Sequence, residues 1–224
     1  MNTPKAVGEC PFCGHEKQIT RDHISPRNLF PKPRISNLIT VPCCEECRNG
    51  WSDDDEYFRL HAISSRSAAN QSAQKIVKKI EDSIEKPRKS GYRRMIQDGL
   101  CEVPIYSKGG IYLGHSSALK VDDKRIRRVM RRIIRGLYCH EHGTSLPSTH
   151  EVKGYVCESD FPVPLLNLLE SINHAGFCPI RKIQDDVFEY TFQPSEEDKN
   201  STLWIGWFYE NIGFFGVTRC RNRV

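Results

Sequence analysis

The stretch ITVPCCEECRNGW, residues 39–51, follows RDHISPRNLF, residues 21–30, and the shorter stretch CPFCG, residues 10–14. The first and last of these stretches each contain a C-x2-C pair. Two such pairs are typical of a four-thiolate zinc site, in which each pair supplies two corners of a tetrahedron. A short polar segment builds little core of its own, so bound zinc would supply on the order of 10 kcal/mol of folding free energy. We therefore predict a structural Zn²⁺ site with four ligands: Cys10, Cys13, Cys44 and Cys47.

Cys43 leaves a second set of ligands open, because Cys43 and Cys47 would form a C-x3-C pair. The C-x2-C spacing is the commoner one, which favours Cys44. The N-terminus MNTPKAVGEC has neither the basic start nor the apolar stretch of a signal peptide, so we expect a cytoplasmic chain with reduced cysteines. No apolar run approaches the ~20 residues that cross a bilayer, so we expect no membrane partner.

The charge of the chain is unevenly distributed. Of the 224 residues, 38% are hydrophobic and 27% charged, which is typical of a globular protein. Residues 1–60 hold 8 Lys/Arg against 9 Asp/Glu, residues 75–135 hold 17 against 7, and residues 136–224 hold 7 against 12. The corresponding net charges are −1, +10 and −5. The middle of the chain is therefore the part best suited to a polyanionic partner.

Between the two cysteine pairs the sequence predicts a strand, a loop, a strand and a helix. KQITRDHI is read as a strand that contains the Asp-His pair near its end, the following segment contains three prolines, LITVP is short and β-branched, and a helix is expected to begin near Glu45. Asp22 and His23 then lie at the end of a strand that faces the start of the helix. There, the carboxylate can bind a divalent ion and the imidazole can activate water.

The order C-x2-C, DHISP, NLITVPCCEEC and DDDEYFR, over residues 10–60, resembles the HNH endonucleases, the ββα-metal nuclease family. The resemblance implies that two cysteine pairs hold a structural zinc, that His23 is the general base and that Asp22 binds a catalytic Mg²⁺ or Mn²⁺. It also implies that Asn37 braces the loop. The implied activity is hydrolysis of phosphodiester bonds in nucleic acid, most of all double-stranded DNA, leaving 5′-phosphate and 3′-hydroxyl ends.

One position departs from the family. The family has a His or Asn directly after the last zinc cysteine, as the second protein ligand of the catalytic ion, and here this residue is Arg48, which is always protonated and cannot bind a cation. Asn49 is the favoured substitute, as catalytic residue and metal ligand, and Asp53 a less favoured one. The third possibility is a domain that keeps its zinc fold without activity. The alternative function is therefore a catalytically inactive, zinc-stabilised nucleic-acid-binding protein.

Residues 122–138 form the clearest predicted helix. Its apolar residues follow the i, i+3, i+4, i+7 pattern of a helix with one buried face, and Asp122 and Asp123 suit its N-terminus. The other face is strongly basic and has few acidic neighbours along the helix. A solvated basic face is the alternative, but a nuclease needs cations for its substrate's phosphates. The candidate nucleic-acid contacts are Arg27, Arg48, Arg125, Arg127, Arg128, Arg131 and Arg132.

The predicted fold class is α+β. We expect a small zinc-bound ββα-metal module over residues 1–63, then an α+β domain over residues 64–224 with basic helices at about 75–138 and a C-terminal antiparallel sheet. YCHEHG, residues 138–143, is interpreted as a helix C-terminus rather than a second metal site. Three further segments complete the prediction. They are a basic loop at residues 88–94, a helix at 163–176, and strands at 187–192, 202–209 and 213–219.

Overall fold

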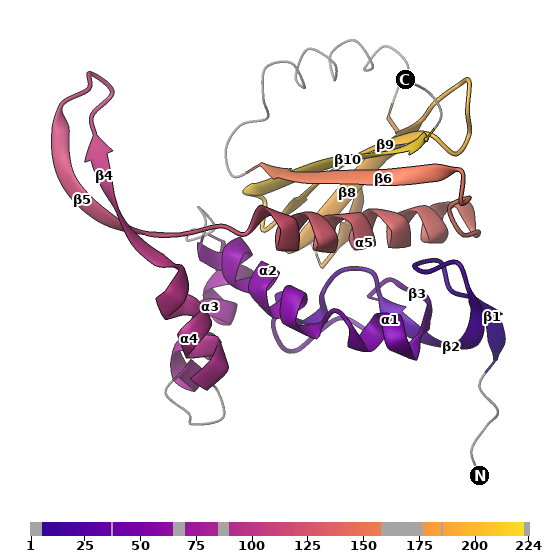
Figure 1. Ribbon diagram of the computed structural model, residues 1–224, viewed down its shortest axis with the longest axis horizontal. Helices are drawn as coiled ribbons and strands as arrows, with labels where there is room; N and C mark the ends of the chain where they lie inside the picture. The colour runs from indigo at the N-terminus through magenta and orange to yellow at the C-terminus, as the bar shows by residue number, and fades with distance from the viewer. Residues whose placement is uncertain are drawn as a thin grey trace.

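The structure is a computed structural model that describes residues 6–36, 38–64, 70–84, 90–157, 177–184 and 186–221. It is a mixed α+β fold in which a long helix, α5, lies between a C-terminal sheet and the N-terminal elements (Figure 1). None of the helices in these ranges is both long and apolar enough to span a bilayer. The helix predicted at residues 163–176 lies outside the described residues.

The N-terminal elements follow the predicted order of strand, loop, strand and helix. β2 pairs antiparallel with both β1 and β3, and the pairing of Asp22 with Val41 and His23 with Thr40 fixes the register. The short helix α1 begins at Glu45, as expected, and α2 follows after Gly50 and Trp51. The elements are β1 (Val7–Glu9), β2 (Glu16–His23), η1 (Arg27–Leu29), β3 (Thr40–Cys44), α1 (Glu45–Asn49) and α2 (Ser52–Ser64).

The middle of the chain differs from the prediction in two ways. The segment 88–94, expected as a loop, instead starts a helix at Ser90, and a β-hairpin that the sequence analysis did not predict follows it. Gly91 is compatible with this helix because it lies within the first turn, where the low helix propensity of glycine destabilises the helix little. The elements are α3 (Gln71–Ile84), α4 (Ser90–Gly99), β4 (Leu100–Tyr106) and β5 (Tyr112–Leu119).

α5 (Asp123–His142) confirms the helix predicted at residues 122–138 and extends it by one turn. The Asp122 side chain caps it by accepting the backbone N–H groups of Lys124 and Arg125 at 3.0 and 3.3 Å. Gly143 ends it in a left-handed conformation, φ 70°, so YCHEHG is the C-terminus of this helix, as interpreted. The predicted apolar positions are all buried: Ile126, Val129, Met130, Ile133, Ile134 and Leu137.

The C-terminal sheet has five antiparallel strands in the order β6-β10-β9-β8-β7, and it confirms the three predicted strands. α5 packs across one face of it, close to the strands, because Gly154 and Gly216 leave room. A Cβ at Gly216 would lie 2.1 Å from Cδ1 of Ile134. The strands are β6 (His150–Cys157), β7 (Arg181–Ile183), β8 (Phe188–Pro194), β9 (Thr202–Phe208) and β10 (Ile212–Cys220).

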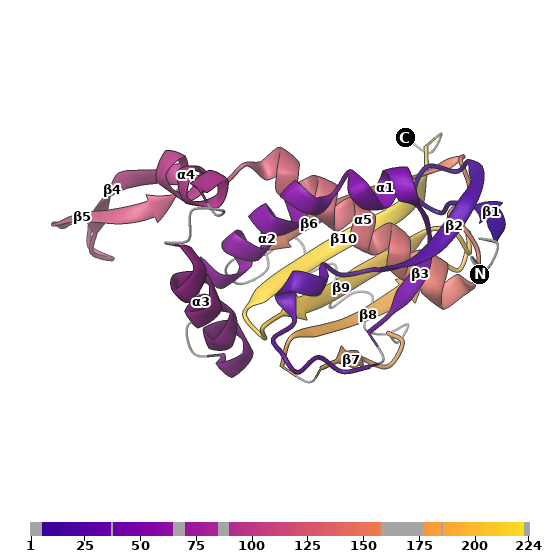
Figure 2. The ribbon, with the colours of Figure 1, turned by 90° about the horizontal axis from the view of Figure 1, so that it is seen from below.

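One hydrophobic core joins the N-terminal elements to the rest of the chain. Phe58 of α2 meets Phe208 of β9 with ring centroids 5.3 Å apart, and the Tyr209 hydroxyl donates to the Leu29 carbonyl at 2.6 Å. Seen from below, β2 and β3 cross α5 on the side away from the sheet (Figure 2). Residues 1–63 therefore share their core with α5 and the sheet, and the sheet orients the site described next. The N-terminal members of this core are Ile24, Leu29, Phe30, Val41, Tyr57, Phe58 and Ala62.

Candidate active site and basic pocket

The four predicted zinc ligands converge. The Sγ atoms of Cys10, Cys13, Cys44 and Cys47 all lie within 4.8 Å of one another, and those of Cys13 and Cys44 are 3.9 Å apart. Tetrahedral zinc with Zn–S bonds of about 2.3 Å separates its sulfurs by about 3.8 Å, so the cluster fits a four-thiolate ion. It is the one such group of Cys, His, Asp and Glu side chains in the described ranges.

Local hydrogen bonds favour the thiolate form of Cys10, whereas burial raises the pKa of Cys13 and of Cys47. The backbone N–H of Cys44 donates to Sγ of Cys10 at 3.5 Å. Burial opposes ionisation, but N–H groups of Cys44, Cys13 and Phe12 outweigh it and lower the pKa of Cys10 to about 7. Cys43 lies outside the cluster, because its buried Sγ donates to the Cys44 carbonyl at 3.3 Å. The structure therefore places Cys44, and not Cys43, in the cluster, in agreement with the preferred set of ligands.

His23 ends β2 and is half-buried. It lines a small cavity with Phe30, Leu38 and Ile183. Burial lowers the pKa of His23 below its usual value of 6.5, the charge of Arg27 lowers it further, and Asp22 partly offsets both. The imidazole is therefore mainly neutral at pH 7, which is the form that can accept a proton.

Asp22 points to the opposite side of the hairpin from His23, because successive residues of a strand alternate. It pairs with buried Val41, on the face that packs toward the helices. Asp55 of α2 lies close enough to Asp22 for the charge of Asp22 to change its pKa. Burial raises the pKa of Asp55, Arg132 partly offsets this, and the negative charge of Asp22 raises it again.

Asp55 is a member of this site that the sequence analysis did not identify. Its carboxylate forms an ion pair with Arg132 at 2.5 Å, and its carbonyl accepts from Nδ2 of Asn28 at 3.2 Å. The acidic run at residues 53–55 was the available signal. The sequence alone does not distinguish Asp55 from Asp53 and Asp54 as a site residue, because the position of α2 relative to the hairpin depends on how both pack against α5.

The other predicted site residues are placed less centrally. Arg48 and Asn49 are exposed in the last turn of α1, which follows the Cys44 end of β3; this end pairs with Ile19, whereas His23 pairs with Thr40 at the other end. Asn49 makes no side-chain hydrogen bond within the described part of the chain. Asn37 lies outside the described residues. The roles predicted for Asn49 and Asn37, and the nucleic-acid contact predicted for Arg48, therefore stay predictions.

Acidic residues of α2 neutralise much of the basic face of α5. Nε of Arg125 and Nε of Arg128 each donate to the Asp54 carboxylate at 2.7 Å. Arg132 pairs with Asp55 and has a side chain only 7% exposed. The sequence analysis expected few acidic neighbours along the helix, and these partners come instead from a segment about seventy residues earlier. The exposed Arg127 pairs within the helix, with Asp123 at 2.7 Å.

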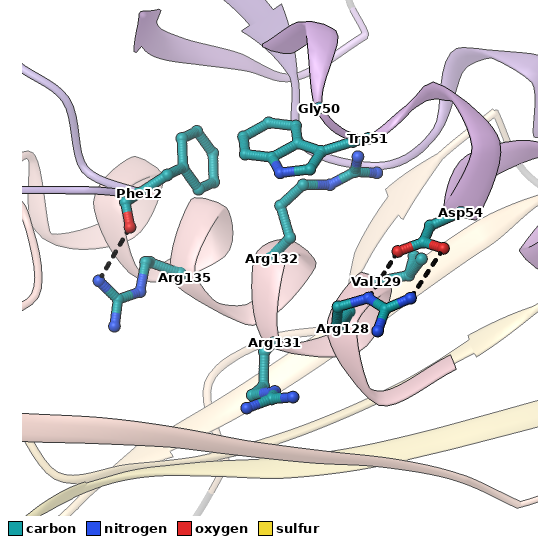
Figure 3. Close-up of a pocket in the computed structure, with 9 residues that line it drawn as sticks. All are labelled: Phe12, Gly50, Trp51, Asp54, Arg128, Val129, Arg131, Arg132 and Arg135. Atoms are coloured by element: carbon teal, nitrogen blue, oxygen red, sulfur yellow. Dashed lines mark hydrogen bonds and ion pairs between the residues drawn. The ribbon is translucent and has the colours of Figure 1, made fainter. Parts of the chain in front are cut away.

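A basic pocket of about 510 Å³ lies between the segments that carry the four-cysteine cluster and α5 (Figure 3). Trp51 stands over the Arg132 guanidinium at 4.7 Å, and Phe12 meets Trp51 edge-on at 4.7 Å. Arg135 donates to the carbonyls of Pro11 and Phe12 at 3.5 and 3.4 Å. The pocket is lined by Phe12, Gly50, Trp51, Asp54, Arg128, Val129, Arg131, Arg132 and Arg135.

Two cations of this pocket have no acidic partner. Arg131 is exposed and donates to the carbonyl of Arg127, and Arg135 bonds only to carbonyls, so neither pairs with a carboxylate in the described ranges. Burial, followed by the charge of Arg221, lowers the pKa of Arg135, although a guanidinium stays charged. With four arginines around one aspartate, the pocket favours an anion.

No protein-family model, curated protein or solved structure matches this chain. The resemblance to HNH endonucleases therefore depends on the residues and their geometry alone.

Proposed function

We propose that this chain is a metal-dependent HNH-type endonuclease that hydrolyses phosphodiester bonds of nucleic acid, with double-stranded DNA as its substrate. The observation that carries the proposal is the state of His23. Its imidazole is half-buried and neutral at pH 7, it is within reach of the charge of the preceding residue, Asp22, and it lies on a hairpin whose other end adjoins the four-cysteine cluster. These are the properties that a general base requires.

In the proposed reaction, His23 accepts the proton of the water that attacks phosphorus. The charge of Arg27, which reaches His23, is suited to hold a substrate phosphate beside this base. The proposed ligands of the divalent ion are Asp22 and Asn49, and Asp55 offers a further carboxylate near Asp22; such oxygen donors suit Mg²⁺ or Mn²⁺. Bound there, the ion would neutralise charge on the phosphate and on the departing oxygen.

The basic pocket supports the choice of a polyanionic substrate. We propose that Arg127, Arg128 and Arg131 contact phosphates, since their side chains are exposed. Arg125 and Arg132 were predicted to do the same, but both are bound to acids of α2. Their proposed part is to hold α2 against α5.

Plasmid cleavage tests the proposal. The zinc-containing protein is incubated with supercoiled DNA and Mg²⁺ or Mn²⁺, as parent, His23→Ala and His140→Ala. Loss of a general base costs about 10²–10⁴-fold in rate, so His23→Ala should be nearly inactive. His140, near the C-terminus of α5, is the matched control and should cleave like the parent. Undiminished cleavage by His23→Ala would exclude His23 as the base.

The second candidate is a zinc-stabilised nucleic-acid-binding protein without catalysis. Two arginines favour this candidate. Arg48 stands where the family has a metal ligand, and the Arg132 guanidinium already pairs with the Asp55 carboxylate that a divalent ion would use. Parent protein that retards DNA in a gel without cutting it, with either metal ion, would decide for this candidate.

A further inference from the structure

A zinc ion on the four cysteines would leave negative charge beside α5. Four thiolates and one divalent ion carry two net negative charges, because the ion balances only two of the sulfurs. Cys10 and Cys44 are buried, and Cys13 and Cys47 are partly buried. A buried charge destabilises a fold unless an opposite charge or hydrogen-bond donors compensate it. The cluster therefore requires a cation nearby.

Arg135 of α5 extends to the turn between the first two cysteines. Its Nη1 donates to the carbonyls of Pro11 and Phe12 at 3.5 and 3.4 Å, and Pro11 lies 124 residues earlier in the chain. Figure 3 shows the guanidinium turned toward the carbonyl of Phe12. Arg135 also lines a second cavity, of about 580 Å³, together with Cys13. The side chain thus lies between the basic pocket and the cysteine cluster.

The charge of Arg135 is opposed by sulfur rather than by a carboxylate. Burial lowers the pKa of Arg135, the charge of Arg221 lowers it further, and the negative charge of Cys10 partly offsets both. Cys10 therefore lies close enough to act on the guanidinium, which stays protonated. Glu9, the one acid that lines the second cavity, is exposed, and neither it nor another described carboxylate pairs with Arg135.

Other cations near the cluster are engaged elsewhere or exposed. Lys17 forms an ion pair with Glu46. Arg48 and Arg221 are exposed. A solvated charge acts weakly on its neighbours, because water and salt screen it. Arg135 is therefore the cation best placed to act on the cluster from a partly buried position.

We propose that Arg135 is the counter-cation of the four-thiolate site and that it holds the zinc ion in place. Its positive charge offsets part of the charge of the thiolates, and its two hydrogen bonds fix the turn that carries Cys10 and Cys13. Both hydrogen bonds are long, so the charge is the larger contribution. This inference rests on the zinc ion of the proposed function, but not on cleavage of nucleic acid.

Competition for zinc with a chromophoric chelator tests the proposal on the full chain, without nucleic acid. Arg135→Gln removes the charge and should bind zinc about 10–100-fold more weakly than the parent, as is typical when a group that supports the metal ligands is lost. Arg135→Lys keeps the charge and should lie closer to the parent. Arg219→Gln is the matched control, because it also removes one cation, which is exposed and bonded to Glu151 at 2.8 Å. It should bind zinc like the parent.

Circular dichroism checks that the variants are folded. Should Arg135→Gln lose its native spectrum, Arg135→Met provides a second neutral variant that keeps the apolar part of the side chain. A folded neutral variant with the zinc affinity of the parent would overturn the proposal, and so would an Arg135→Lys as weak as Arg135→Gln or an Arg219→Gln that loses as much. A parent that binds no zinc would overturn it together with the zinc site. A protein that shows the expected zinc affinities but cleaves no DNA would support the role of Arg135 and contradict only the nuclease activity.

Discussion

Replacing Asp54 by asparagine removes the carboxylate that two arginines of α5 share. Its two oxygens accept from Nε of Arg125 and Nε of Arg128, each at 2.7 Å. The Asp54 side chain is 16% exposed and that of Arg125 21%, whereas that of Arg128 is 54% exposed. The pair with Arg125 is therefore partly buried, and the pair with Arg128 is largely solvated.

The two pairs contribute differently to stability. A solvated ion pair contributes about 0–1 kcal/mol, and a hydrogen bond to a charged group about 1.5–3 kcal/mol. Because the asparagine carbonyl keeps one neutral hydrogen bond, we expect Asp54→Asn to lower the free energy of unfolding by about 1–3 kcal/mol, as measured by urea denaturation. Asp123→Asn, which removes the exposed pair with Arg127 and a favourable charge in the first turn of α5, should cost no more than about 1 kcal/mol.

The same substitution should strengthen nucleic-acid binding while it weakens the fold. Arg128, one of the proposed phosphate contacts, loses a competing anion, and each additional phosphate contact steepens the dependence of log affinity on log salt by about 0.9. Fluorescence anisotropy with a labelled DNA duplex at several salt concentrations measures both effects. A less stable Asp54→Asn whose affinity and salt dependence equal those of the parent would refute phosphate contact by Arg128.

Three further predictions concern pH and packing. The pKa of His23 is lowered, so the cleavage rate should rise with pH and level off near or below pH 6.5; a rate that still rises tenfold per pH unit above pH 7 would argue against His23 as base. Hydrogen bonds, first from Ser201, lower the pKa of Asp198 to about 2. The Asp198 carboxylate therefore stabilises the fold fully above about pH 4, and this contribution is lost as the pH falls through about 2. In Asp198→Asn, the free energy of unfolding should depend less on pH over that interval. Gly216→Ala should destabilise by at least about 1–3 kcal/mol in thermal unfolding, since its Cβ would clash with Ile134, whereas Gly91→Ala, in open space, should not.

Elements with one buried face could be predicted from the sequence. The helical spacing from Ile126 to Leu137 is a direct consequence of burial on one side, whereas β8, β9 and β10 combine partial alternation with runs of three consecutive buried residues. The C-x2-C spacing likewise identified the thiolate cluster, because the spacing itself produces the turn that brings two sulfurs together.

The remaining features depend on contacts between distant segments. The β4–β5 hairpin has no buried face, so its sequence shows no alternation to detect. Asp54 and Arg128 are 74 residues apart, and only the shared core places α2 beside α5. The same packing brings Asp55 near Asp22, which no local pattern could indicate.

X-ray absorption at the zinc edge of the purified protein is the most direct measurement, because we propose that a zinc ion on the four cysteines holds the hairpin that carries Asp22 and His23. We expect one zinc per chain with four sulfur ligands at about 2.3 Å. Protein that contains no zinc, or zinc with nitrogen or oxygen in place of any of the four sulfurs, would contradict it.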